Sequence, residues 1–178
     1  MSGESGKSTR SPLSYSIWLM PSGNEKNQLK ARIQSLGSNF EGPLFEPHVT
    51  LVGGFLGKEK ELLKKIETIS KRISPFKLFF DGVAYLNEFF RSLFLIVKFN
   101  PQLIAARKIA CTELDWEDED YLPHLSLIYG HFTENQKAEM ALTVGSIPVS
   151  YIVNSIYLAY NDEINLKWRV IKIFQLTK

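Results

Sequence analysis

The chain has 178 residues, of which 44% are apolar and 22% are charged. This suits one large globular domain or two small lobes and excludes a large multidomain protein. The formal charge of +2 gives no reason to expect a long polyanion as an obligatory partner. A single cysteine, Cys111, excludes an internal disulfide, and no apolar run approaches the roughly 20 residues that span a bilayer. We therefore expect a cytoplasmic, monomeric protein that does not bind membranes.

Residues 1–13 are rich in serine and glycine and show no apolar period, so we expect them to be disordered or not native to the protein. Within them, Gly6-Lys7-Ser8 is similar to the end of a phosphate-binding P-loop. A P-loop needs an earlier glycine and a strand leading into it, and the sequence before this tripeptide has room for neither. We expect one domain with two lobes over residues 14–178.

The first half of this domain predicts five elements in the order strand, helix, strand, helix, strand. Aromatic and β-branched residues mark the strands, and apolar residues three and four apart mark the helices. Gly37 stands where the C-cap glycine of the first helix belongs. We expect these five elements at residues 15–20, 29–36, 47–51, 62–73 and 76–85.

The second half repeats the same order. Asn100-Pro101 predicts an N-cap followed by proline at the first helical position, and Thr133 with Gln136 predicts a capping box. A final hairpin is expected to turn at 161–163 toward a strand at 168–174. The five repeated elements are expected at residues 93–99, 103–114, 123–127, 133–142 and 149–160.

Corresponding features of the two halves lie about 75–79 residues apart, which indicates an internal duplication. The alternative is that an α+β protein mixes such elements by coincidence. A duplicated chain predicts two lobes related by a pseudo-twofold axis, so the segments 47–51 and 123–127 should face each other across a groove. His48 and His124 should then lie within about 10 Å of each other, close enough to bridge one phosphate group.

Both segments read Pro-His-aliphatic-Ser/Thr-Leu. Because alternate side chains of a strand share a face, His48 and Thr50 point to one side, and His124 and Ser126 repeat the arrangement. Each copy offers an imidazole and a hydroxyl about 7 Å apart on a rigid strand. His131 also precedes a threonine by two residues, but it lacks the neighbouring proline and leucine. Either copy alone favours a structural surface histidine, whereas the two together favour catalysis.

This pairing suits in-line attack at phosphorus. Histidine titrates near neutrality, so one imidazole can take a proton from the nucleophile while the other gives a proton to the leaving oxygen. The hydroxyls of Thr50 and Ser126 can donate hydrogen bonds to the phosphoryl oxygens as negative charge moves onto them. Such chemistry requires no metal and no cofactor.

At these residues the chain resembles the 2H phosphoesterase superfamily, and within it the plant and yeast type of cyclic nucleotide phosphodiesterase. The likeness extends over residues 14–176 and is carried by the segments 15–18, 42–50 and 121–129. It implies an α+β, bilobal, internally duplicated fold in which two antiparallel sheets face a central cleft and the helices lie outside.

The resemblance also implies an activity, the hydrolysis of a cyclic phosphate. The substrates implied are 2′,3′-cyclic nucleotides and ADP-ribose 1″,2″-cyclic phosphate, and the products are a 2′-phosphate and, for ADP-ribose, a 1″-phosphate. By the same resemblance, His48 and His124 are the acid and base, with His124 activating water. Thr50 and Ser126 bind the phosphate.

Four aromatic residues are candidates for the rest of the substrate site. The likeness places Trp18 and Tyr129 on the wall of the cleft. Together with Phe89 and Phe90 they can provide a platform on which a nucleobase stacks. The alternative for all four side chains is simple core packing.

Six acidic residues fall within residues 113–120, just before the second motif. We expect a solvated loop there, and the sequence leaves open whether it closes over the cleft as a lid. An acidic rim would repel a long nucleic acid strand, so the expected partner is a small nucleotide cyclic phosphate. Two alternatives stay open: an RNA-processing relative that acts on RNA ends or 2′-5′ linkages, and a non-catalytic module that binds RNA or phosphate.

Overall fold

The computed structural model describes residues 11, 13–117, 120–145 and 147–177, and its elements follow the predicted order. The expected disorder of residues 1–13 falls mostly outside the described residues, although Leu13 already belongs to the first strand. The first half forms β1 (Leu13–Leu19), α1 (Gly23–Phe40), β2 (Val49–Phe55), α2 (Glu59–Ser70) and β3 (Phe76–Ala84). The second half forms the short 3-10 helix η1 (Phe89–Arg91), β4 (Leu93–Val97), α3 (Pro101–Leu114), β5 (His124–Ile128), α4 (Glu134–Thr143), β6 (Ser150–Val153), β7 (Ser155–Asp162) and β8 (Lys167–Gln175).

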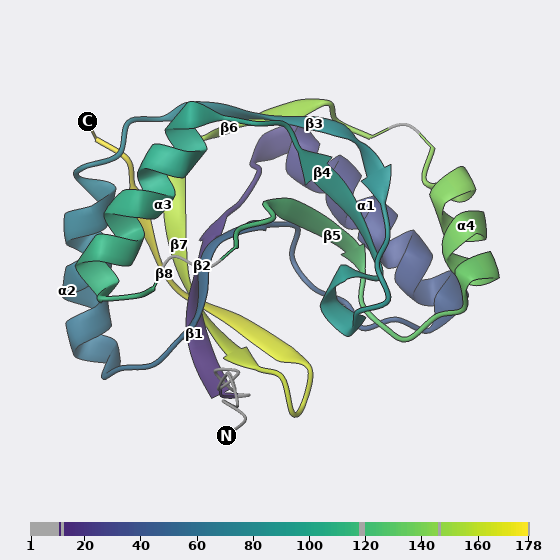
Figure 1. Cartoon of the computed structure of the whole chain (residues 1–178), viewed down its shortest axis with the longest axis horizontal. Helices are drawn as coiled ribbons and strands as arrows, with labels where there is room; N and C mark the ends of the chain where they lie inside the picture. Colours follow the sequence, from purple (N-terminus) through teal and green to yellow (C-terminus); the bar gives the residue numbers. More distant parts are fainter. Residues whose placement is uncertain (1–10, 12, 118–119, 146, 178) are drawn as a thin grey trace, which may run out of the picture.

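The strands form one curled antiparallel sheet in the order β6-β3-β4-β5-β2-β1-β7-β8 (Figure 1). This order mirrors the duplication, because the equivalent strands β5 and β2 meet in the middle and the equivalent strands β4 and β1 flank them. Within the described residues, β2 and β5 share the single pair Val49↔Leu125. The two predicted sheets are therefore β6-β3-β4-β5 and β2-β1-β7-β8, joined edge to edge at one residue pair, and the bilobal α+β fold is confirmed.

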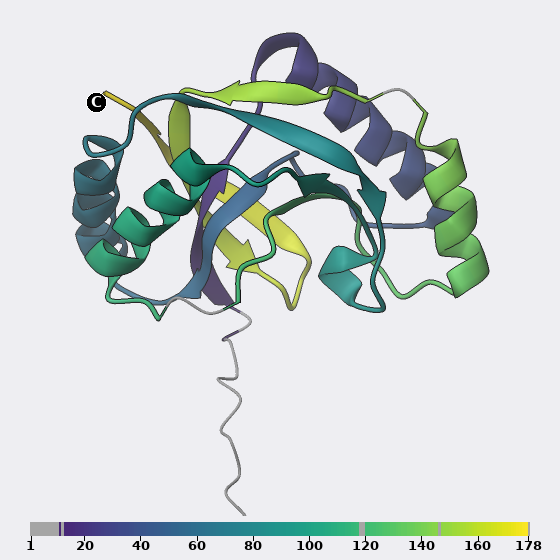
Figure 2. The same ribbon diagram turned by 45° about the horizontal axis from the view of Figure 1, so that its top comes forward.

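Each lobe contains elements from both halves of the chain. From the first half, α1 packs on β5, whereas α3 from the second half packs on β2. Likewise β3 pairs with β4, and β7 pairs with β1. Figures 1 and 2 show α2 and α3 beside one lobe and α1 and α4 beside the other, on the outside of the curled sheet. Neither half of the sequence completes a lobe by itself.

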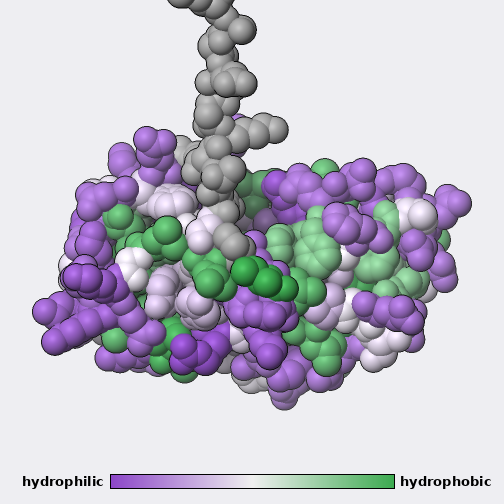
Figure 3. All heavy atoms as spheres, turned by 90° about the horizontal axis from the view of Figure 1, so that it is seen from below, coloured by the Kyte–Doolittle hydropathy of each residue, from purple (hydrophilic) through white to green (hydrophobic). Residues whose placement is uncertain are grey.

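The core between the sheet and the helices decides which way the motif strands face. Val49, Leu51, Leu125 and Leu127 are completely buried. They alternate with the histidines and hydroxyls of the motifs, which therefore point to the opposite side of the sheet. The face that carries η1 and the tip of the β7–β8 hairpin shows hydrophobic side chains grouped between hydrophilic ones (Figure 3). In the described part of the chain, no helix has the length and apolar character needed to cross a membrane.

The first helix runs past Gly37, so the predicted C-cap is wrong. Glu41 takes the left-handed conformation instead, with a φ of 57°, and the N–H of Gly42 donates to the carbonyl of Gly37 at 3.0 Å. Gly37 is buried within α1, where an added Cβ would lie 3.1 Å from the carbonyl oxygen of Gly42 and 3.1 Å from Leu44 Cδ2. The glycine thus permits the close approach of the following loop rather than a special backbone conformation.

The predicted strand over 149–160 is two strands, because the chain crosses from one lobe to the other at Asn154. Here β6 pairs with β3, whereas β7 pairs with β1. The final hairpin is present, but its turn lies later than predicted. Asp162 still pairs with Lys167, so the turn spans 163–166 rather than 161–163.

Both predicted helix N-caps are confirmed. Asn100 Oδ1 accepts a hydrogen bond from the N–H of Leu103 at 3.0 Å, with proline at the next position. Thr133 and Gln136 form the reciprocal capping box at the start of α4.

Replacing Asn100 by alanine should lower the free energy of unfolding by about 1 kcal/mol, because the first turn of α3 loses its cap. The side-chain amide also donates to the carbonyl of Lys77 at 2.8 Å, and Asn100→Ala removes that bond as well. Asn100→Asp keeps the capping oxygen and should lose less. Urea unfolding measures both variants, and an unchanged midpoint for Asn100→Ala would contradict this role of the cap.

Candidate active site

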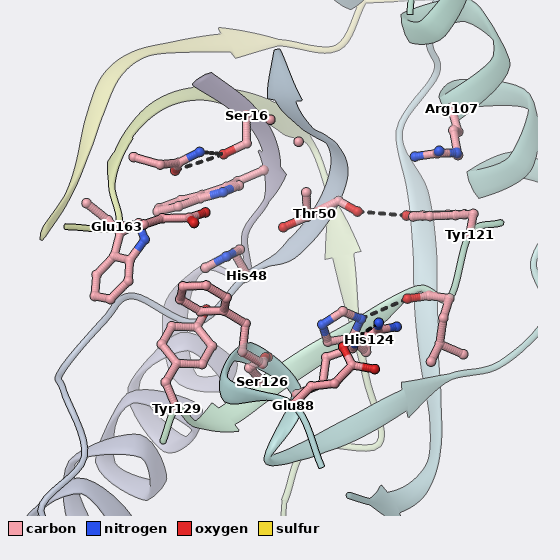
Figure 4. Close-up of a pocket in the computed structure, with 18 of the residues that line it drawn as sticks. Ser16, His48, Thr50, Glu88, Arg107, Tyr121, His124, Ser126, Tyr129 and Glu163 are labelled. Carbon is pink, nitrogen blue, oxygen red and sulfur yellow. Dashed lines mark hydrogen bonds and ion pairs between the residues drawn. The ribbon is translucent and has the colours of Figure 1, made fainter. Parts of the chain in front are cut away.

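The cleft lies where β2 and β5 part after their single shared pair. A cavity of about 310 Å³ opens there, lined by residues from both lobes (Figure 4). The structure places all four motif residues on its wall: His48, Thr50, His124 and Ser126. One cavity therefore receives an imidazole and a hydroxyl from each copy of the motif.

The two imidazoles are held in the same way. His48 Nδ1 lies 2.6 Å from the carbonyl oxygen of Glu46, and His124 Nδ1 lies 2.8 Å from that of Leu122. A carbonyl oxygen can only accept, so each Nδ1 carries the hydrogen of the neutral ring. In both copies this leaves Nε2 as the nitrogen that can exchange a proton with a substrate.

The loop before the first motif is tied to α1 by ion pairs. The Glu46 carboxylate contacts the ammonium groups of Lys26, at 2.9 Å, and of Lys30. Because the carbonyl of the same residue holds His48, this anchoring also fixes the orientation of the imidazole ring.

His48 is buried beneath an aromatic side chain. Trp18 stacks on it with the ring centroids 3.8 Å apart and the planes 12° from parallel, and only 8% of the histidine is exposed. Burial lowers the pKa of His48 to about 4, the bond to the Glu46 carbonyl opposes this shift, and positive charge on His124 adds to it. His48 is therefore neutral at neutral pH.

His124 has a more polar environment. The ring of Phe94 contacts it edge-on at 5.2 Å, and Glu88 and Arg91 lie beside it on the cleft wall. Those two residues form an ion pair, with Arg91 Nε 2.8 Å from Glu88 Oε2. Burial lowers the pKa of His124, the bond to the Leu122 carbonyl raises it, and the opposite charges of Arg91 and Glu88 act against each other.

Two hydroxyls at and just after the second motif are hydrogen-bonded within the protein. Ser126 Oγ donates to the carbonyl of Phe90 at 2.8 Å, so it must turn toward a phosphate to bind it. Tyr129 is hydrogen-bonded to Ser126, and burial raises the pKa of the tyrosine above its usual range. Its hydroxyl therefore stays protonated and remains a donor.

The predicted aromatic residues Trp18, Tyr129 and Phe90 all line the cavity. Trp18 is only 2% exposed, and its ring stacks on His48 while the side chain also packs against Met20 and Ala159. Phe89 does not line this cavity and borders a second, apolar hollow between η1 and the β7–β8 hairpin. Nucleobase stacking on these residues remains a prediction.

Comparison with known proteins agrees with this geometry. Residues 13–177 match the family model described as cyclic phosphodiesterase-like protein. The chain is 29% identical over 154 residues to the cyclic phosphodiesterase of Arabidopsis thaliana, covering 83% of this chain and 85% of the relative. It is 31% identical over 150 residues to the 2′,3′-cyclic-nucleotide 3′-phosphodiesterase of Kluyveromyces lactis, covering 73% and 70% of the two chains.

The chain belongs to the cyclic phosphodiesterase-like family. Among solved structures, apo LigT from E. coli has a TM-score of 0.63 at 16% identity and covers 93% of this chain and 98% of its own. TT0787 of Thermus thermophilus has a TM-score of 0.62 at 12% identity, covering 92% and 97%. These likenesses confirm the fold expected of a 2H phosphoesterase. The protein is thus a phosphodiesterase, an enzyme rather than a non-catalytic binding module.

Several lining residues of the phosphodiesterase were not singled out from its sequence. Ser16 offered a signal, because it lies two residues before Trp18 and so shares its face of β1. Arg107 offered none, because a basic residue on a helix usually faces solvent. The polar and aromatic residues missed in this way include Ser16, Glu88, Arg91, Arg107, Asn161 and Trp168.

The acidic segment before the second motif is only partly the solvated loop that was predicted. Glu113 lies in the last turn of α3 and pairs with Arg72 at 3.4 Å, and Asp115 caps the same helix and pairs with Lys65 at 3.2 Å. Asp120 lines the cavity of the phosphodiesterase. Residues 118–119 lie outside the described residues, so the question of whether this segment closes over the cleft stays open.

Replacing Trp18 by leucine should raise the pKa of His48 from about 4 toward its ordinary value, because the ring loses the side chain that buries it. Trp18→Phe keeps an aromatic cover and is the matched control, with a smaller rise expected. An NMR titration of the histidine ring protons measures both. If Trp18→Leu leaves the His48 midpoint near 4, the stacked indole is not what desolvates the ring.

Proposed function

We propose that this enzyme hydrolyses cyclic phosphates on ribose, with 2′,3′-cyclic nucleotides and ADP-ribose 1″,2″-cyclic phosphate as its substrate class. The products are a 2′-phosphate and, for ADP-ribose, a 1″-phosphate. The observation that carries this proposal is that two identically held imidazoles, His48 and His124, line one cavity together with the hydroxyl residue of each motif copy.

The proposed reaction is a direct displacement by water. As His124 Nε2 takes a proton from the attacking water, the water oxygen bonds to phosphorus and the bond to the 3′ oxygen breaks. His48, protonated when the anionic substrate enters, gives its proton to the leaving oxygen. Thr50, Ser126 and Tyr129 donate hydrogen bonds to the phosphoryl oxygens, which carry more negative charge in the transition state. The histidines supply the acid and base, and no metal takes part.

The names of the relatives support the substrate class. The Arabidopsis thaliana relative is a cyclic phosphodiesterase, and the Kluyveromyces lactis relative is a 2′,3′-cyclic-nucleotide 3′-phosphodiesterase. Carboxylates of Glu88, Asp120 and Glu163 line the cavity, which favours a small nucleotide over a long RNA strand. Turnover of a mononucleotide should therefore exceed that of an oligonucleotide with the same cyclic end.

Phosphorus NMR of a 2′,3′-cyclic nucleotide should show conversion to the 2′-monoester, with the same rate in EDTA. Loss of either His48 or His124 by substitution with alanine should lower kcat/KM by about 10²- to 10⁴-fold. His131→Ala is the matched control, since His131 also precedes a threonine by two residues but is exposed and outside the cavity. A 3′-monoester as product would refute the proposed leaving group, and full inhibition by EDTA would refute the metal-free mechanism.

The dependence on pH follows from the two buried rings. Catalysis needs one ring neutral and the other protonated, and burial lowers the pKa values of both, that of His48 to about 4. The protonated ring becomes scarce as pH rises above the higher of the two values. We expect kcat/KM to be greatest below pH 6.5 and to fall about tenfold per pH unit above it. A flat profile from pH 7 to 9 would contradict this protonation scheme.

A further inference from the structure

The backbone that carries the phosphate-binding threonine runs along the split in the sheet. Among the described residues, β2 pairs with β5 only at Val49↔Leu125, and on its other side Thr50 pairs with Trp18 of β1. After Val49, therefore, β2 has no strand neighbour on the cleft side. A strand in this position lacks cross-strand hydrogen bonds that would fix its carbonyl groups.

Two side chains from the second half of the chain bind these carbonyls. The hydroxyl of Tyr121 donates to the carbonyl of Thr50 at 2.8 Å, and Arg107 Nη1 donates to the carbonyl of Leu51 at 2.7 Å. The Arg107 guanidinium lies over the Tyr121 ring at 4.1 Å, and Arg107 is only 7% exposed. Figure 4 shows the tyrosine reaching across to Thr50 with the arginine beside it. The donors are thus mutually packed, and one of them is charged, which strengthens its hydrogen bond.

Comparison of the two motif copies shows that the tyrosine hydroxyl is present in only one of them. Tyr121 lies three residues before His124, and the residue three before His48 is Phe45. Phe45 packs its ring on Tyr129 at 3.8 Å and has no hydroxyl to donate. The fold therefore accepts phenylalanine at this motif position in one copy, and the hydroxyl in the other copy is available for a task beyond packing.

We propose that Tyr121 and Arg107 are positioning residues that set the orientation of the Thr50 hydroxyl toward the phosphate. This inference rests on the proposed function of the same cleft. The position of Oγ1 follows the backbone of Thr50, and that backbone is held on the cleft side by the Tyr121 and Arg107 bonds. A displacement of an ångström or less in such a donor is enough to weaken its contact in the transition state.

The test is a double-mutant cycle between Tyr121→Phe and Thr50→Ala. Tyr121→Phe should lower kcat by about 10- to 100-fold with little change in KM, and it should cause almost no further loss once Thr50 is alanine. Tyr85→Phe is the control, because Tyr85 is 38% exposed and lies outside the cavity. Its effect on kcat should be negligible.

An equal loss in the wild-type and Thr50→Ala backgrounds, or no loss in either, would overturn the proposal. If Tyr121→Phe does not fold, Arg107→Lys enters the same cycle, since it keeps the charge but loses the planar group that packs on the tyrosine. The cycle is repeated on the Kd of inorganic phosphate measured by calorimetry. A wild type that binds phosphate with this coupling but turns over no cyclic nucleotide would refute the proposed function and leave the positioning role standing.

Discussion

The structure depends on a sheet that is continuous across one residue pair and open beyond it. If β2 and β5 paired along their whole length, the strands would close the cleft, and if they did not pair at all, nothing would fix the register of the two motifs. The pair Val49↔Leu125 satisfies both requirements, because each partner directly follows a motif histidine. The same two residues are completely buried against the helices, so the residues that pack the core also fix the positions of the neighbouring imidazoles.

Exchange of elements between the lobes makes this junction stable. Because α1 packs on β5 and α3 packs on β2, each motif strand is backed by a helix from the other half of the chain. Folding of one lobe therefore requires both halves, and we expect the molecule to unfold as a unit rather than lobe by lobe. This arrangement also keeps the cleft rigid, since its two walls cannot separate without breaking the core.

Local patterns in the sequence were sufficient for much of this architecture. The motifs, the duplication, the caps at Asn100 and Thr133 and the direction of the motif side chains all follow from spacing along one segment. The failures have a common cause in contacts between distant segments. Gly37 is required by the close approach of a later loop, and the strand break at Asn154 reflects a change of lobe. The hydrogen bond from Arg107 depends on the gap between β2 and β5, which the sequence does not show.

The duplication supplies two motifs with the same types of residue, whereas the proposed displacement at phosphorus needs one histidine as the acid and the other as the base. The backbone does not distinguish them, because both imidazoles donate to the carbonyl two residues earlier. The side chains that surround the two imidazoles do distinguish them. His48 is stacked under Trp18 and almost wholly buried, while His124 meets the edge of Phe94 and the ion pair on η1. In the proposed mechanism, the negative charge of the substrate favours protonation of the buried copy from solvent, its low pKa then makes it a strong proton donor, and the more polar copy accepts a proton. Under the proposed mechanism, acid and base therefore differ through the side chains that each lobe packs around the same motif, without any change in the motif itself.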